Sequence, residues 1–167
     1  GVTVNAPGAG TPTGTITVSD GSQTCTITLP ATSCNLTSTT AGAKTLTATY
    51  NGDANFNPSP PSAGVPHQVN KADTTTTIVS DNPDPSVFGQ NYTVVFTVTA
   101  NAPGAGTPTG TVTFNIDGNL YCVNTPLANV GGAQKASCTQ AGLPALAAGN
   151  RVVVALYSGD TCFNPSA

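Results

Sequence analysis

Apolar and polar residues alternate along many short stretches of the chain. In residues 15–19, for example, Ile16 and Val18 share one face of an extended segment and threonines occupy the other. A period of two is typical of a half-buried β-strand, and no stretch has the period of an amphipathic helix. The same alternation predicts further strands at residues 24–29, 44–50, 92–99, 111–116 and 151–157. Glycine- and proline-rich turns separate these strands, so the sequence predicts an all-β fold with two antiparallel sheets packed as a sandwich.

One segment of the chain occurs twice. Residues 5–15, with the sequence NAPGAGTPTGT, return unchanged as residues 101–111. Residues 51–59 and 158–166 form a second matched pair, each following a strand that ends in tyrosine. Repetition over such a period indicates tandem modules. We expect one module at residues 1–70 and a second at residues 71–167, joined by a linker at residues 70–72.

The two predicted modules differ in which strands they contain. Compared with the second module, the first lacks its first strand and most of its second, and the second module lacks a counterpart of residues 64–69. Each sandwich is therefore expected to be incomplete. Two explanations remain open. The chain is a fragment of a longer repeat protein, or it is a polymerising subunit whose open sheet edges take strands from another copy.

Charged residues are rare and acidic ones prevail. They make up 7% of the chain, with four Lys and Arg residues against seven Asp and a net charge of −3. Scattered basic groups argue against nucleic-acid partners and against attraction to anionic lipid. The longest apolar stretch, residues 152–156, is far too short to insert across a membrane.

Four of the five cysteines hold matched positions in the two modules. Cys25 and Cys34 are placed on the two arms of one predicted hairpin, and Cys122 and Cys138 on the arms of its counterpart. We predict a disulfide within each pair, bridging neighbouring strands of one sheet. Such bonds indicate an oxidising compartment, outside the cell. The fifth cysteine, Cys162, replaces Asn55 of the first module and is a candidate for an intermolecular bond.

The sequence holds little that could carry catalysis or bind a cofactor. There is no Glu, His67 is the only histidine, and no Gly-x-Ser-x-Gly motif is present. Zinc is disfavoured because Cys-x-x-Cys is absent. Calcium at Asp81, Asp84 or Asp160 remains an alternative, although no Asp-x-Asp-x-Asp-Gly loop occurs. We expect a protein that is not an enzyme and has no cofactor.

Several motifs resemble those of one known family. They are the run SDNPDPSVFGQ at residues 80–90, the loop GTPTGT, the Asp-Gly turns and the sequence ATYNGD at residues 48–53. Together they resemble the bacterial Ig-like domain repeat family over nearly the whole chain. The resemblance implies Ig-like Greek-key sandwiches, placement outside the cell or on its surface, and a spacer, adhesive or filament role. It implies no catalytic residue, because the family has no shared active site.

Two functions follow from these expectations. The first is a structural module of an extracellular bacterial fibre or surface protein that assembles head-to-tail with copies of itself or with adjacent Ig-like repeats, by strand donation. The alternative is an adhesin module whose loops bind a glycan or a host protein. A ligand site requires clustered aromatic and polar groups. The nine aromatic residues of this chain are scattered singly along the sequence, which favours the first function.

The sequence also predicts two surfaces of the second module that contact other modules or chains. One is a loop expected at the module junction, in which Asp160 fixes its own turn through side-chain to backbone hydrogen bonds, as Asp53 does in the first module. The other is an apolar outer face on the strand at residues 151–157, where the first module has threonines. The junction residues are Pro103, Gly104, Gly106, Pro108 and Asp160, and the contact residues are Val152, Val154, Leu156 and Cys162.

Overall fold

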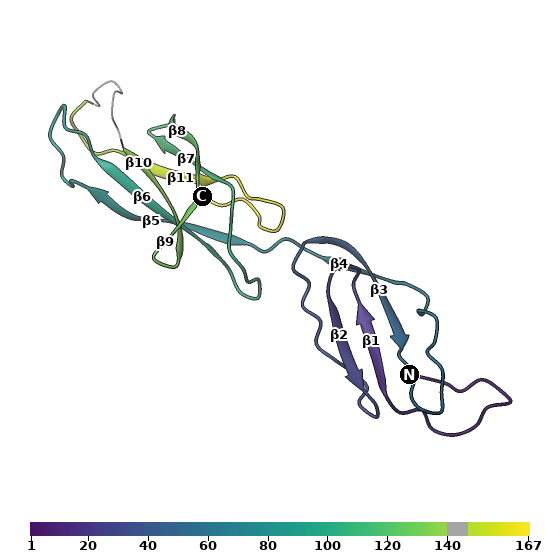
Figure 1. The fold of residues 1–167 in the computed structure, drawn as a ribbon. Helices are drawn as coiled ribbons and strands as arrows, with labels where there is room; N and C mark the ends of the chain where they lie inside the picture. The colour runs from purple at the N-terminus through teal and green to yellow at the C-terminus, as the bar shows by residue number, and fades with distance from the viewer. Residues whose placement is uncertain (140–146) are drawn as a thin grey trace. The chain divides into compact units, whose positions relative to one another are not determined.

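The structure is a computed structural model that describes residues 1–139 and 147–167. The chain divides into two compact units, residues 1–70 and residues 71–167 (Figure 1). The regular secondary structure of the described residues consists of β-strands, with no helix among them. Strands β1 to β4 belong to unit 1 and β5 to β11 to unit 2. Their bounds are β1 Thr15–Ser19, β2 Thr24–Thr28, β3 Gly42–Tyr50, β4 Val65–Val69, β5 Thr74–Asn82, β6 Thr93–Ala100, β7 Thr111–Ile116, β8 Asn119–Pro126, β9 Ala128–Val130, β10 Ala133–Thr139 and β11 Val153–Tyr157.

Unit 1 is a single antiparallel sheet with the strand order β2-β1-β3-β4. Its core is small, because only Ile16, Ile27 and Tyr50 are buried hydrophobic residues. Val65 on β4 pairs with Leu46 on β3 and yet remains 59% exposed. The inner face of this sheet is therefore only partly covered.

Unit 2 packs two antiparallel sheets face to face. One sheet has the order β5-β6-β10-β9 and the other β11-β7-β8. The alternating residues of β6 and β7 point inward, and the ring centroids of Phe96 and Phe114 lie 5.5 Å apart between the sheets. The buried core is Val94, Phe96, Val98, Val112, Phe114, Ile116, Ala136, Cys138, Ala155, Tyr157 and Phe163.

The predicted hairpin from residue 120 to residue 138 is not formed. β8 pairs with β7, whereas β10 pairs with β6 and β9 in the other sheet. The chain changes sheets at Leu127, whose N–H donates to the carbonyl of Gly110. Pro126 ends β8 because it has no N–H with which to continue the ladder.

The returning strand predicted near Cys34 in unit 1 is also absent. Residues 31–38 run beside the sheet without strand pairing. In unit 2 the matching cysteine, Cys138, lies on β10, which pairs with β6. Unit 1 has no counterpart of β6, so this segment has no strand with which to pair. The sequence also predicts strand structure at residues 2–4 and 151–152, but these residues lie outside the observed strands.

Candidate functional site

Two disulfides reinforce the two units. Cys25 on β2 is bonded to Cys34, and Cys122 on β8 is bonded to Cys138 on β10. The pairs are those expected from the sequence, but the prediction that each joins neighbouring strands of one sheet is wrong. The Cys122–Cys138 bond connects the two sheets of unit 2, because the chain changes sheets between the two residues. The Cys25–Cys34 bond ties the edge strand of unit 1 to a segment that has no strand partner.

The repeated loop of unit 2 is fastened to the loop after β11 by one carboxylate. Oδ2 of Asp160 accepts hydrogen bonds from the N–H and the hydroxyl of Thr109, at 2.8 and 2.6 Å. Its Oδ1 accepts the N–H groups of Cys162 and Phe163, at 2.7 and 2.8 Å. Burial alone would raise the pKa of Asp160, but these four bonds favour the charged form and hold the pKa below its usual value.

A buried tyrosine completes this connection between the two loops. The hydroxyl of Tyr157 donates to the carbonyl of Thr109 at 2.5 Å. Burial, together with the negative charge of Asp160, raises the pKa of Tyr157 to about 12. The tyrosine is therefore neutral and keeps its donor proton at neutral pH.

Unit 1 repeats this arrangement. Asp53 accepts the N–H and the hydroxyl of Thr13 at 2.7 and 2.6 Å, and the N–H groups of Asn55 and Phe56 at 2.7 and 2.9 Å. The hydroxyl of Tyr50 donates to the carbonyl of Thr13 at 2.7 Å. The expectation that both aspartates fix their loops is confirmed.

In unit 2 the repeated loop and the loop after β11 hold residues 71–73. The N–H of Ala72 donates to the carbonyl of Cys162, and the carbonyl of Ala72 accepts the N–H of Asn164, at 2.9 and 2.8 Å. The Lys71 ammonium donates to the carbonyl of Asp160 at 2.5 Å. Of the predicted junction residues, Pro108 is buried and Gly104 is half-buried. Their role at a junction between modules remains a prediction.

The two units differ at one sheet edge. In unit 1, β4 pairs with the first half of β3, from Gly42 opposite Val69 to Leu46 opposite Val65. The residue of β11 that matches Leu46 is Val153, and β11 begins there. Within the described chain, the edge of β11 that faces away from β7 is met only by a bridge between Tyr157 and Ser166. In the described chain, residues 149–152, which match the start of β3, have no paired strand like β4 beside them, and β11 is shorter than β3.

The outer side chains at residues 152–156 are apolar, as expected. Val152 is 67% exposed, Leu156 is 38% exposed and Val154 is half-buried. The sequence analysis missed Leu120 on β8, which is 56% exposed and is separated from Val154 of β11 by Asn115 of β7. Cys162 does not belong to the face, because it is half-buried and packs against the core of unit 2.

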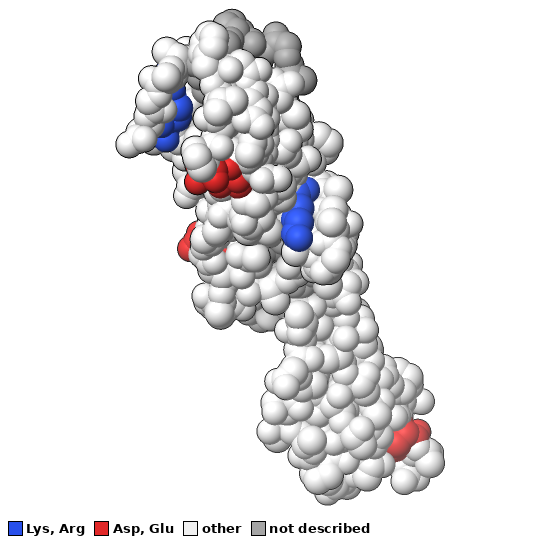
Figure 2. Space-filling model, turned by 90° about the vertical axis from the view of Figure 1, so that its left-hand side faces the viewer, with Lys and Arg blue, Asp and Glu red and all other residues white. Residues whose placement is uncertain are grey.

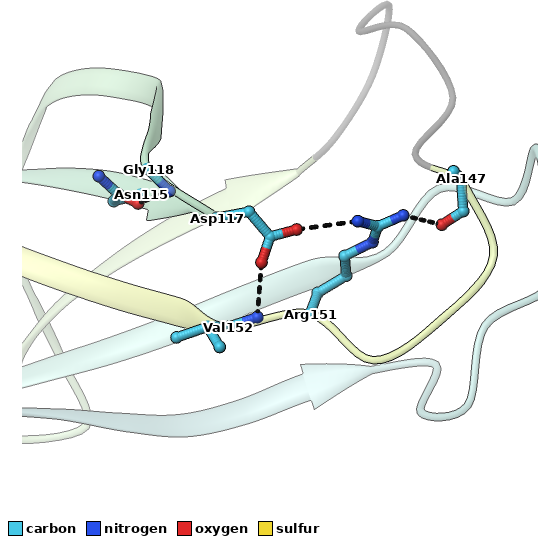
Figure 3. A network of polar contacts seen from close by, with 6 residues as sticks. All are labelled: Asn115, Asp117, Gly118, Ala147, Arg151 and Val152. Atoms are coloured by element: carbon cyan, nitrogen blue, oxygen red, sulfur yellow. Dashed lines mark hydrogen bonds and ion pairs between the residues drawn. The ribbon is translucent and has the colours of Figure 1, made fainter.

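A network of polar contacts fixes the start of β11 (Figure 3). Asp117 accepts the N–H of Val152 at 2.9 Å and a guanidinium N–H of Arg151 at 3.0 Å. Both bonds lower the pKa of Asp117, the bond from Val152 most. The same guanidinium also donates to the carbonyl of Ala147. In unit 1 the matching Asp20 is 3% exposed, and its pKa is lowered by hydrogen bonds from Ser38 and from its own turn.

Arg151 also lines a cavity at this end of unit 2. The cavity has a volume of about 420 Å³ and lies between residues 81–92 and residues 147–153. Phe88 and Tyr92 lie on its wall, and Phe88 is 75% exposed. These two aromatic residues are brought together by the turn between β5 and β6. The sequence analysis had treated all the aromatic residues as isolated.

The described residues hold no arrangement typical of a metal centre. They contain no group of three His, Cys, Asp or Glu side chains that could bind a metal ion. The aspartates considered for calcium, Asp81, Asp84 and Asp160, therefore belong to no such group among the described residues. Charged groups are isolated on the face drawn in Figure 2. No helix in the described part of the chain could span a membrane.

Two facing antiparallel sheets with this strand order define an Ig-like β-sandwich protein. Residues 1–70 and 79–167 match the model of the bacterial Ig-like domain, group 3, so the chain belongs to that family. No curated protein and no solved structure matches it. Family membership confirms the resemblance seen in the sequence and indicates a module of a bacterial surface protein. Domains of this family are typically structural and not enzymatic.

Proposed function

We propose that the chain is a structural repeat module of an extracellular bacterial fibre or surface protein, and that it joins like modules by backbone pairing at its sheet edges. The observation that carries the proposal is the edge of β11. The matching edge of β3 holds a strand, and a strand edge without a partner is a template for another one. Val154 and Leu156 on the outer face of β11, together with Val152 just before the strand, supply further apolar contact area.

The test is to supply β11 with a partner of the β4 type. A copy of residues 61–70 joined after Ala167 would bring the copy of Val65 opposite Val153, in the register that Val65 has with Leu46. We expect unit 2 to be stabilised by about 1 kcal/mol, a part of the effect of fully burying a valine side chain, because Val65 itself stays 59% exposed on β4. We also expect the N–H of Ala155 to exchange more slowly with solvent, because the matching N–H of Ala48 donates to Ser62.

The control is an extension of equal length in which the copies of Val65 and Val69 are aspartate. Equal exchange rates at Ala155 in the extended and the unextended chain would contradict strand pairing at this edge.

The cavity beside Phe88 supports a second candidate function, that of an adhesin module. Sugar rings can stack on aromatic faces, and sugar hydroxyl oxygens can accept hydrogen bonds from a guanidinium. Titration of the chain with a panel of glycans should then shift the NMR signals of Phe88, Tyr92 and Arg151, and Phe88→Ala should weaken binding about tenfold. Leu120→Ala, on the exposed outer face of another part of unit 2, is the control. Unshifted signals throughout the panel would argue against glycan binding at this cavity.

A further inference from the structure

We propose that unit 1 carries a docking slot for the linker segment of another Ig-like module, with the Lys-Ala-Asp-Thr chemistry of residues 71–74. The slot lies between the repeated loop at residues 5–15 and the loop at residues 51–59. The inference rests on the proposed function and deepens it by naming the segment that one module receives from another.

Unit 2 demonstrates how such a segment is held. Besides the two backbone bonds of Ala72, the carbonyl of Asp73 accepts the N–H of Asn101 at 2.8 Å, and its carboxylate accepts the side-chain amide of Asn164 at 2.8 Å. The hydroxyl of Thr74 donates to the carbonyl of Asn164 at 2.9 Å and lies 2.8 Å from the hydroxyl of Ser166. Every residue from Lys71 to Thr74 therefore has a polar partner in these two loops.

The slot in unit 2 admits only a small side chain at its centre. A Cβ atom built on Gly104 would lie 2.4 Å from the Cβ of Ala72, closer than two carbon atoms can approach. Gly106 lies against the ring of Phe163 in a less severe contact, with 3.3 Å between its built Cβ and the ring. The glycines of the repeated loop thus make room for the segment and for the ring beneath it.

The residues that line the slot are nearly the same in unit 1 as in unit 2. The repeated loop is identical in sequence, and a Cβ built on Gly10 would lie 3.3 Å from the ring of Phe56. The residues that bind the segment in unit 2, through backbone or side-chain groups, have identical counterparts in unit 1 with one exception, which binds only through its backbone carbonyl. The counterparts are Asn5 for Asn101, Asp53 for Asp160, Asn57 for Asn164 and Ser59 for Ser166, and the exception is Asn55 in place of Cys162.

In unit 1, no described residue makes the backbone hydrogen bonds that Ala72 makes in unit 2. The backbone of Asn57 and the carbonyl of Asn55, which match the groups bonded to Ala72, have no hydrogen-bond partner among the described residues. Phe56 is half-buried, whereas Phe163 beneath the linker of unit 2 is 5% exposed. The side chain of Val4 leans toward the space, with its Cγ1 3.0 Å from a Cβ built on Gly8. An incoming segment must displace the Val4 side chain from this space. The matching residue in unit 2 is the smaller Ala100.

The experiment supplies the segment in the same chain. A copy of residues 71–96 joined ahead of Gly1 places the copied alanine as many residues before Gly8 as Ala72 stands before Gly104. We expect the N–H of Asn57 to exchange at least tenfold more slowly than in the unextended chain, because the matching N–H of Asn164 donates to Ala72. Val4→Ala in the extended chain should slow the exchange further.

The control is the same extension with leucine in place of the copied alanine, which cannot fit against Gly8. It keeps the added strands, and slow exchange at Asn164 reports that unit 2 is folded. Equal exchange at Asn57 in the alanine and leucine versions would overturn the slot, even if the added strands raise the melting temperature of unit 1. The proposed function would survive that result, because pairing at β11 is tested separately in unit 2.

Discussion

Replacing both Cys122 and Cys138 with alanine should lower the free energy of unfolding of unit 2 by about 3 kcal/mol. The two residues are 16 apart in the sequence, and the bond restricts the unfolded chain over that length. In the folded state it joins the two sheets across the core, where Cys138 is 2% exposed. Chemical denaturation of the oxidised variant and parent chains would measure the difference.

The matched control is the double replacement of Cys25 and Cys34. That bond closes a shorter loop, with a separation of 9, and lies wholly in unit 1. Its loss should destabilise unit 1 by about 2.5 kcal/mol and leave the transition of unit 2 in place. A Cys122/Cys138 variant as stable as the parent chain would mean that the two sheets are held together by packing alone.

Gly104→Ala should destabilise unit 2 by about 1–3 kcal/mol, the usual cost of overpacking a close contact. The added methyl group would meet the Cβ of Ala72 at 2.4 Å and push residues 71–73 away from their backbone partners. Thermal unfolding and hydrogen exchange at Asn164 would measure the effect. Slow exchange at that N–H depends on the carbonyl of Ala72 staying in place.

Ala72→Gly provides the rescue that identifies the cause. The single variant keeps all its backbone hydrogen bonds and should be mildly destabilised, whereas the double variant should recover most of the stability lost in Gly104→Ala. Such non-additivity is expected of two residues in direct contact. Simple addition of the two losses would show that Gly104 is needed for another reason.

The strands were the most predictable part of this protein. Alternation around Ile16 and around Phe96 reports burial on one face, and the structure has strands at both places. The sheet to which each strand belongs was less predictable. Cys122 and Cys138 were assigned to one hairpin because consecutive strands usually pair, but nothing local to the sequence marks the crossing at Leu127. The absent strand at Cys34 depends on a distant strand that unit 1 does not contain.

The candidate surfaces were predictable to different degrees. The identical loops pointed to a shared structural task, and the acidic turn residues Asp53 and Asp160 fulfil their predicted roles. The contact between Gly104 and Ala72 could not be foreseen, because a sequence does not tell which backbone atoms approach one another across 32 residues. The cavity beside Phe88 was missed for the same reason, since it is formed by two loops far apart in the chain.

Electron cryomicroscopy of the native bacterial surface material would test the central claim most directly, because it images the edge of β11 in place. We expect an added strand antiparallel to β11, beginning opposite Val153 in the register that Val65 has with Leu46 on β3. Modules that follow one another with this edge exposed to solvent would contradict the claim.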